Sequence, residues 1–144
     1  MITTTNDLLA LNRAQLDDRF RAGAVGAMPD GPGRGTVIQL GGTPMAPLLA
    51  GLGRVFWQGK QFDAASVSLQ NLLSPARVRA IRATVLEGRS RLDGAPCLVL
   101  DYSRTSLLAR PVRDEIREIS AGLWLGLVFI GTRRVPVHFA LQFT

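Results

Sequence analysis

Apolar and polar residues follow two patterns along the chain, one helical near its start and one typical of strands over most of the rest. Four apolar residues set the helical spacing: Leu8, Leu11, Leu16 and Phe20. Asn6 or Asp7 can cap the first turn, and Gly23 ends the pattern. This spacing predicts an amphipathic helix over about residues 6–22 that lies across the core.

A turn and a second short helix are expected before the main series of strands. The Pro-Asp-Gly-Pro-Gly sequence of residues 29–33 predicts a turn that leads into a strand at about 36–40. Residues 46–52 are good helix formers that end at Gly53, which predicts a short second helix before Trp57.

Strand patterns fill most of the remaining chain. After residues 36–40, the strand-like segments are 56–62, 65–73, 78–86, 97–102, 112–119, 123–130 and 136–143. Turn sequences at Leu92-Asp93-Gly94, Ala121-Gly122 and residues 131–134 predict hairpins between consecutive strands. Large aromatic residues flank Gly59-Lys60, which predicts a bend where the backbone comes close to another group.

The segment 112–119 allows two interpretations. Val112, Ile116 and Ile119 also fit a helical stripe, at positions i, i+4 and i+7. We favour a strand, because the tight Ala121-Gly122 turn into a β-rich segment suits a hairpin better than the end of a helix.

Seven or eight strands with a leading helix predict a mainly β protein with a single domain over residues 1–144 and a barrel at about 34–144. An open sheet of such apolar strands would expose unpaired edges, so we expect a single closed antiparallel barrel of the lipocalin-like kind. An eight-stranded barrel is just wide enough to hold one small ligand.

The segment 113–118 carries five charges in six residues. In a strand, alternation would place Val112, Asp114, Ile116 and Glu118 on one face and Arg113, Glu115, Arg117 and Ile119 on the other. Neither face is fully apolar, so the barrel interior would carry charge unless this strand is at an edge. The alternative is a solvated face whose cross-strand ion pairs stabilise by under about 1 kcal/mol each.

The net charge of +6 does not indicate a nucleic-acid partner. Of the 17 basic residues 16 are Arg, a skew that often reflects genomic base composition. The excess is concentrated in residues 77–91, which hold no aromatic residue that could stack on a base. Between Asp101 and Glu118 four acidic residues balance four Arg. We therefore expect no nucleic-acid partner.

The cysteine and histidine content and the hydropathy of the chain limit the kinds of protein it can be. The single Cys97 cannot form an internal disulfide, and the lone His138 leaves a metal site incomplete. From the first residues we expect no signal peptide, and the longest apolar run, residues 123–130, is far shorter than the roughly 20 residues that span a bilayer. Phosphate-loop, dinucleotide and nucleophile-elbow patterns are missing. We expect a soluble, cytoplasmic protein without a cofactor or metal.

Five residues are catalytic candidates: Asp114, Glu115, Tyr102, Arg113 and Arg117. A carboxylate at 114 or 115 would act as a base, an Arg would hold a developing anion, and the Tyr102 hydroxyl would act as an acid. Opposite charges in a low-dielectric site would also shift one another's pKa. The alternative for Tyr102 is packing at the barrel mouth with its hydroxyl in water.

Five further residues are candidates for ligand binding: Trp57, Lys60, Asp101, Trp124 and His138. The tryptophans would wall an apolar ligand or belong to the ordinary core. Lys60 would reach a carboxylate or form a Schiff base if desolvated, or else lie on an exposed bend. Asp101 and the Tyr102 hydroxyl should lie on opposite faces of the strand. His138 stands in an apolar strand, where a histidine is more often structural than a base.

The sequence Trp57-Gln58-Gly59-Lys60, followed by Phe62, resembles the signature of the bacterial GXWXGK domain, one of a group of small lipocalin-like proteins without established function. Where that signature has a glycine two residues before the tryptophan, this chain has Val55. The resemblance implies a calycin-type barrel with an interior pocket, and it supplies no catalytic residue.

Two main classes of function remain. In the first, the barrel binds a small apolar molecule such as a lipid, isoprenoid or polyketide, with an ionic group at one polar end. In the second, the same pocket is a cofactor-independent acid–base enzyme, an isomerase or cyclase. A third alternative is a structural subunit that associates with itself through its apolar faces, and a homodimer is compatible with any of the three.

Overall fold

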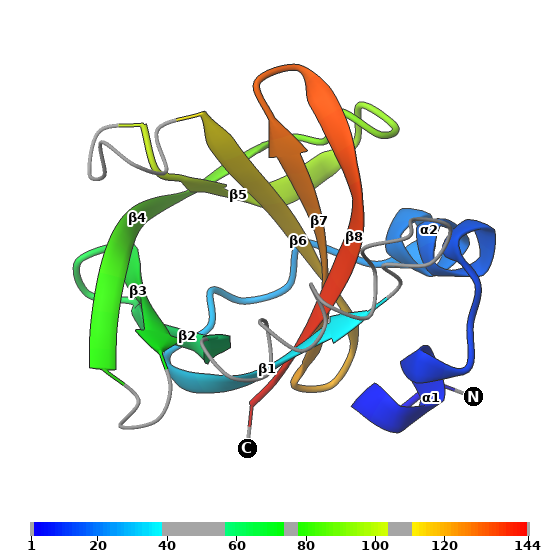
Figure 1. The fold of residues 1–144 in the computed structure, drawn as a ribbon, viewed down its shortest axis with the longest axis horizontal. Coiled ribbons are helices and arrows are strands. Elements are labelled where there is room, and N and C mark those ends of the chain that lie inside the picture. The colour runs from blue at the N-terminus through cyan, green and yellow to red at the C-terminus, as the bar shows by residue number, and fades with distance from the viewer. Residues whose placement is uncertain (1, 39–56, 74–77, 104–110, 144) are drawn as a thin grey trace.

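The strands of this protein close into a barrel. The computed structural model describes residues 2–38, 57–73, 78–103 and 111–143. Eight strands follow in chain order: β1 (Gly31–Ile38), β2 (Trp57–Asp63), β3 (Ser68–Leu73), β4 (Val78–Arg89), β5 (Pro96–Asp101), β6 (Val112–Ser120), β7 (Leu123–Ile130) and β8 (Arg133–Gln142). Each strand pairs antiparallel with the next, and β8 returns to pair with β1, so the sheet has no free edge (Figure 1). The predicted mainly β, closed antiparallel barrel is confirmed.

Both faces of β5 and β7 are apolar because each face has its own cover. Leu98 and Leu100 point into the barrel, whereas Cys97 and Val99 belong to a core on its outer side. That outer core is completed by helices packed beside β8, β1 and β7 (Figure 1). A strand buried on both faces has no apolar–polar alternation, which explains the continuous apolar run of β7.

The predicted helix over residues 6–22 is two helices, α1 (Thr5–Leu9) and α2 (Arg13–Ala22). Asn12 breaks it, because its side chain accepts from the Gln15 amide at 2.9 Å and caps a new helix. Thr4 caps α1, and Asp7 serves as the acidic partner of that cap. Asn6 and Asp7 are therefore not the capping residues that the sequence predicts.

The segment 112–119 is strand, so its helical interpretation is wrong. The turn sequences at 92–94 and 121–122 do connect hairpins. The turn predicted at 29–33 is only partly correct, since β1 already begins at Gly31, and the last strand begins at Arg133 and not at Pro136. The helix predicted over 46–52 lies outside the described residues.

Gly59 explains the predicted close approach at the start of β2. Its φ is +140°, and a Cβ at this position would overlap the carbonyl oxygen of Gly33 on the neighbouring strand. The β2–β3 register also shifts between Trp57 and Gly59. A residue without a side chain is required here, because the backbones of β1 and β2 meet too closely for any other.

The segment between α2 and β1 crosses one end of the barrel (Figure 1). Ala24 forms a β-bridge with Glu118, and Val25 and Met28 pack against the interior core. At this end β2, β4, β6 and β8 finish, whereas β1, β3, β5 and β7 finish at the opposite end. The crossing segment therefore covers one end of the interior with apolar side chains.

Candidate functional site

A compact polar cluster lies inside the otherwise apolar barrel. The interior core consists of Phe62, Leu69, Ala83, Val85, Leu98, Leu100, Tyr102, Ile116, Trp124, Phe139 and Leu141. Among these, strands β2, β3 and β6 contribute Lys60, Asn71 and Asp114, which are 3%, 6% and 5% exposed. Tyr102, which directly follows β5, is 2% exposed. Four polar groups from four parts of the sequence thus converge in one buried place.

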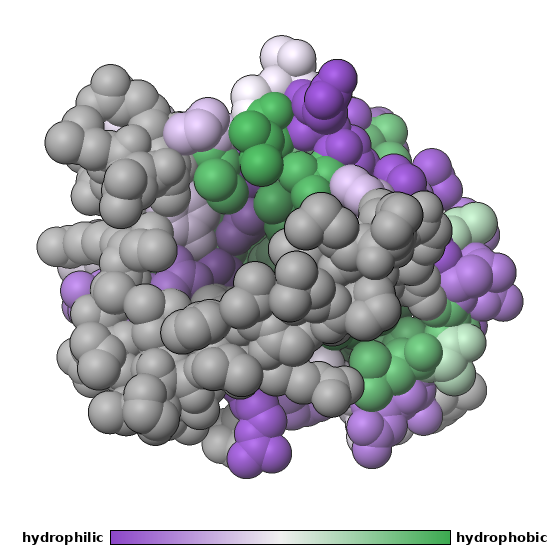
Figure 2. Space-filling view, in the orientation of Figure 1, coloured by the Kyte–Doolittle hydropathy of each residue, from purple (hydrophilic) through white to green (hydrophobic). Residues whose placement is uncertain are grey.

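Strand register brings these side chains together. Lys60 faces Asn71 across the β2–β3 pair, and Asp114 faces Leu100 across the β5–β6 pair, two residues before Tyr102. All four lie toward the end of the barrel at which β1, β3, β5 and β7 finish, opposite the end covered by Val25 and Met28. Viewed along the barrel, the surface is hollowed, and hydrophilic and hydrophobic atoms lie next to each other at depth (Figure 2).

The cluster is held by direct hydrogen bonds. The Lys60 ammonium donates to Asn71 Oδ1 at 2.8 Å and to the Tyr102 hydroxyl at 2.7 Å, and it lies 3.2 Å from Asp114 Oδ2. The Tyr102 hydroxyl donates to the same Asp114 oxygen at 3.2 Å and accepts from Asn71 Nδ2 at 3.2 Å. The Lys60 nitrogen also lies 5.4 Å from the centre of the Phe139 ring.

Burial and charge act against each other in this cluster. Burial raises the pKa of Asp114, although Lys60 acts to lower it. Burial also raises the pKa of Tyr102, which keeps the phenol protonated. For Lys60, burial acts to lower the pKa, but Tyr102 and Asp114 outweigh burial and raise it. Lys60 is therefore a buried ammonium ion paired with a carboxylate.

One oxygen of the Asp114 carboxylate is open, in the sense that no described residue donates a hydrogen bond to it. Both contacts of this side chain use Oδ2, and among the described residues nothing donates to Oδ1. The side chain keeps 7% of its surface exposed although the residue is buried. Oδ1 is thus a hydrogen-bond acceptor that a molecule held at this end of the barrel would meet.

Two expectations for the interior residues need correction. For Lys60 the alternative of an exposed bend is wrong, because the closed barrel turns this side chain inward and buries it. Its protonated state also opposes the Schiff-base role, because only the neutral amine is a nucleophile. For Tyr102 the alternative of a hydroxyl in water is wrong, since that hydroxyl is buried and hydrogen-bonded to three groups.

The other charged candidates of β6 point away from the interior. Glu115 accepts from the Ser90 hydroxyl at 2.6 Å and the Arg91 amide at 2.9 Å, and it pairs with Arg113 at 3.0 Å. These contacts hold the β4–β5 turn against the outer face of the barrel. Asp114 and Glu115 are neighbours in sequence, and the period of two in a strand places them on opposite faces.

Arg117 is fully engaged on the same outer face. It makes a bidentate pair with Asp93 at 2.7 and 2.8 Å, and it donates to the carbonyl oxygens of Phe20, Ala95 and Pro96. Its guanidinium carbon lies 4.5 Å from the centre of the Phe20 ring. The hydrogen bond from Arg117 lowers the pKa of Asp93 to about 2. Arg113 and Arg117 therefore do not reach the interior, and the expectation that an Arg there holds an anion is corrected.

His138 also lies outside the barrel, where α2 packs on β8. Its Nε2 lies 2.7 Å from Asp17 Oδ1, and Arg134 makes a bidentate pair with the same carboxylate. Burial lowers the pKa of His138, and Arg134 lowers it further, although Asp17 acts to raise it. This group joins a helix to a strand and has no contact with the interior cluster.

The remaining candidates lie in separate places. Trp124 belongs to the interior core, whereas the side chain of Trp57 lies outside the described part of the chain. Asp101 faces outward and accepts from the Ser103 amide at 2.8 Å, on the face opposite Tyr102 as the sequence predicts. Cys97 is buried in the outer core, where burial raises the pKa of its thiol to about 12.

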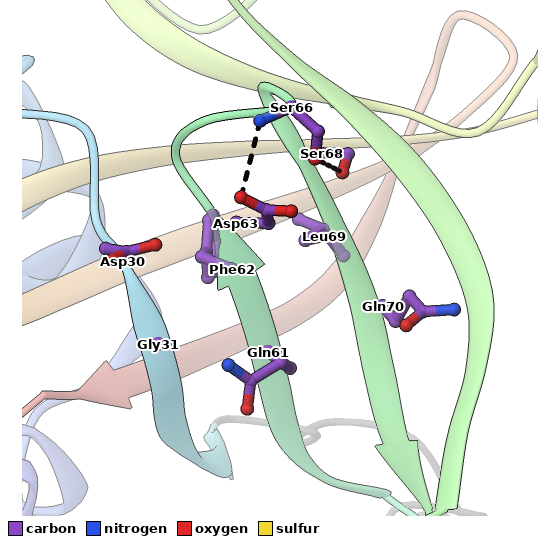
Figure 3. Close-up of a pocket in the computed structure, with 9 residues that line it drawn as sticks. All are labelled: Asp30, Gly31, Gln61, Phe62, Asp63, Ser66, Ser68, Leu69 and Gln70. Atoms are coloured by element: carbon purple, nitrogen blue, oxygen red, sulfur yellow. Dashed lines mark hydrogen bonds between the residues drawn. The ribbon is translucent and has the colours of Figure 1, made fainter.

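A cavity of about 440 Å³ opens at the other end of β2 and β3, away from the interior cluster. Its polar lining includes Asp30 and Asp63, each of which accepts hydrogen bonds from backbone amides of the β2–β3 turn. Figure 3 shows the Asp63 carboxylate directed at the Ser66 amide, with Gln61 and Gln70 farther along the strands. Asp30, Asp63 and Ser66 are exposed and hold a turn in place, so this cavity is the weaker candidate.

Asn71 is the member of the cluster to which the sequence gives no role. Alternation does predict that it shares a face with Leu69. It pairs with Lys60 in the regular part of the β2–β3 ladder, but register shifts lie close by, between Trp57 and Gly59 and, in the β3–β4 ladder, between Gln70 and Asn71. Such shifts leave no clear mark in the sequence.

Comparison with known proteins supports the fold. No family model matches the chain, and no curated protein matches it. The crystal structure of a protein from Thermomonospora curvata is similar, with a TM-score of 0.65 and 20% sequence identity over 93% of this chain and 88% of that chain. At this identity the likeness concerns the fold alone.

No group of three or more His, Cys, Asp or Glu side chains in the described residues could hold a metal ion. None of the described helices is both long and apolar enough to cross a membrane.

Proposed function

We propose that the protein binds one small apolar molecule inside the barrel, with the cluster of Lys60, Asn71, Tyr102 and Asp114 orienting its polar end. The observation that carries this proposal is a buried ion pair, connected by hydrogen bonds, whose carboxylate keeps an open oxygen inside an apolar interior. Binding sites for small molecules are typically apolar with a few polar groups that fix orientation.

Stability alone does not account for the cluster. Moving a lysine and a carboxylate out of water costs several kcal/mol for each ion, and replacing a buried pair by apolar residues is often neutral or stabilising. A barrel interior built for stability would be filled with aliphatic side chains, as it is where Leu98 faces Ile116 across β5 and β6. The ion pair fits a role in recognition better.

The ligand classes we propose are lipids, isoprenoids and polyketides. An eight-stranded barrel is wide enough for one such molecule, and Trp124 and Phe139 would contribute aromatic walls. The GXWXGK resemblance of residues 57–60 implies the same kind of interior pocket, and in this chain that segment supplies Lys60 of the cluster.

Native mass spectrometry of the freshly purified protein tests the proposal. We expect a retained molecule of a few hundred daltons that is released by organic solvent and identified as apolar. The Lys60→Met/Asp114→Leu variant removes both charges and should retain less of it, whereas Asp101→Asn, which changes a carboxylate on the outer face, should retain as much as the unmodified protein. A protein that carries no molecule and binds no apolar probe by calorimetry would contradict the proposal.

A second candidate function is favoured by the same carboxylate. A carboxylate with a raised pKa, an open oxygen and a cation 3.2 Å away has the parts of a general base beside a group that stabilises an anion. In this cofactor-independent isomerase or cyclase, Asp114 would remove a proton and Lys60 would stabilise the resulting negative charge. If the retained molecule is converted by the unmodified protein and held unchanged by Asp114→Asn, the enzyme is supported; if neither protein converts it, binding alone stands.

A further inference from the structure

The interior cluster offers a ligand a hydrogen-bond acceptor. The three ammonium protons of Lys60 are matched by three acceptors: Asn71 Oδ1, the Tyr102 hydroxyl and Asp114 Oδ2. The hydroxyl proton of Tyr102 is directed at Asp114 Oδ2. The Asn71 amide donates to the Tyr102 hydroxyl. Among the described residues nothing donates to Asp114 Oδ1, which can only accept while the carboxylate is ionised.

The charge of the interior also disfavours an anionic ligand. The ammonium of Lys60 and the carboxylate of Asp114 cancel, so the pair has no excess positive charge for an anion. A carboxylate at the polar end of a ligand would meet the Asp114 carboxylate, which repels a second negative charge and has no proton to donate.

We infer that the ligand is uncharged and that its polar end is a hydroxyl group, which donates a hydrogen bond to Asp114 Oδ1. This inference rests on the proposed binding function and narrows it to apolar alcohols, in preference to carboxylic acids with the same chain. A hydrogen bond to a charged acceptor raises affinity by roughly ten- to a hundredfold over a ligand that lacks the donor.

Calorimetry on the unmodified protein tests this with three probes that share one chain: 1-decanol, decyl methyl ether and decanoic acid. The ether keeps the oxygen but has no proton to donate, and the acid is ionised at pH 7.5. We expect the alcohol to bind at least about tenfold more tightly than the ether, and the acid to bind no more tightly than the ether.

The outcomes separate the inference from the function on which it rests. Binding of the acid or the ether as tight as that of the alcohol would overturn the hydroxyl inference and leave an apolar-ligand protein. If none of the three probes binds, the proposed function itself fails for chains of this size, and the inference fails with it.

The Asp114→Asn variant provides a second, directional test. Lys60 and Tyr102 both donate toward position 114, so the amide oxygen should take the place of Oδ2 and the amide NH₂ the place of Oδ1. The open position then changes from an acceptor to a donor. We expect the advantage of the alcohol over the ether to disappear, whereas Asp101→Asn, on the outer face, should preserve it. A full alcohol advantage in a folded Asp114→Asn protein would contradict the assignment of Oδ1.

Discussion

Replacing Lys60 by methionine should strongly destabilise the protein, because it leaves the Asp114 carboxylate buried without its cation. The two charges are 3.2 Å apart, and at an effective dielectric constant of about 20 their attraction amounts to about 5 kcal/mol. Removing one member of a buried pair typically costs about 3–5 kcal/mol. We expect Lys60→Met to lose an amount in this range from the free energy of unfolding at pH 8.

The loss should shrink as the pH falls. Without Lys60, the pKa of Asp114, already raised by burial, should rise further. The folded variant then holds a proton that the unfolded chain gives up above its ordinary carboxyl pKa, so the folded state becomes relatively more stable as the pH decreases. Lys60→Met should therefore be closer to the unmodified protein at pH 5 than at pH 8.

Urea denaturation followed by tryptophan fluorescence measures both effects. The Lys60→Met/Asp114→Leu variant should recover most of the loss, since no unpaired charge remains and Asn71 can still pair with the Tyr102 hydroxyl. Arg21→Met, which removes an exposed ion pair with Asp18, is the control and should change stability by under about 1 kcal/mol. A loss of less than about 1 kcal/mol for Lys60→Met at pH 8, with no dependence on pH, would refute the buried ion pair.

Three further predictions concern the frame around the site. Arg117→Met should lower the free energy of unfolding, measured by urea denaturation, by about 3–5 kcal/mol, because Asp93 and three carbonyl oxygens lose their donor. The folded fraction should still bind ligand normally. Weakened affinity would show that this outer group does influence the interior. Gly126→Ala should lower the free energy of unfolding by about 1–3 kcal/mol in the same assay, since the added methyl group would overlap the Phe139 ring. An unchanged stability would mean that the ring moves freely. Burial and Arg134 lower the pKa of His138 from its ordinary 6.5. Below pH 6.5 the unfolded chain therefore takes up a proton at this residue more readily than the folded chain does, so the folded state becomes less stable as the pH decreases. His138→Gln should flatten the decline in melting temperature between pH 6.5 and 5, and parallel curves for the two proteins would count against this assignment.

The barrel could be predicted because its strands are short, separated by recognisable turns and too apolar to leave a sheet edge exposed. Alternation within β6 also predicts correctly that Asp114 and Glu115 lie on opposite faces. The direction of those faces could not be derived, because both are buried: one by the opposite wall of the barrel, the other by α2 and the β4–β5 turn.

The site itself was harder to predict, since it depends on contacts between distant strands. Lys60 and Tyr102 are 42 residues apart, and their contact depends on how the barrel closes and on the register shifts in β3 and its neighbours. A lysine beside a glycine is typical of an exposed bend, and only the close approach of Gly59 to β1 shows why the chain is constrained there. The break at Asn12 was missed because the apolar spacing continues through it, while the cap depends on one side chain.

The central claim, that a ligand binds at this interior cluster, can be tested with two atoms. Lys60 is the one lysine of the chain and Tyr102 the one tyrosine, so ¹³C labelling of lysine Cε and tyrosine Cζ gives a single NMR signal from each side of the cluster. During titration with 1-decanol, both signals should shift and saturate at the stoichiometry and affinity measured by calorimetry. Calorimetric binding that leaves both signals in place would contradict the claim, because the ligand would then lie elsewhere.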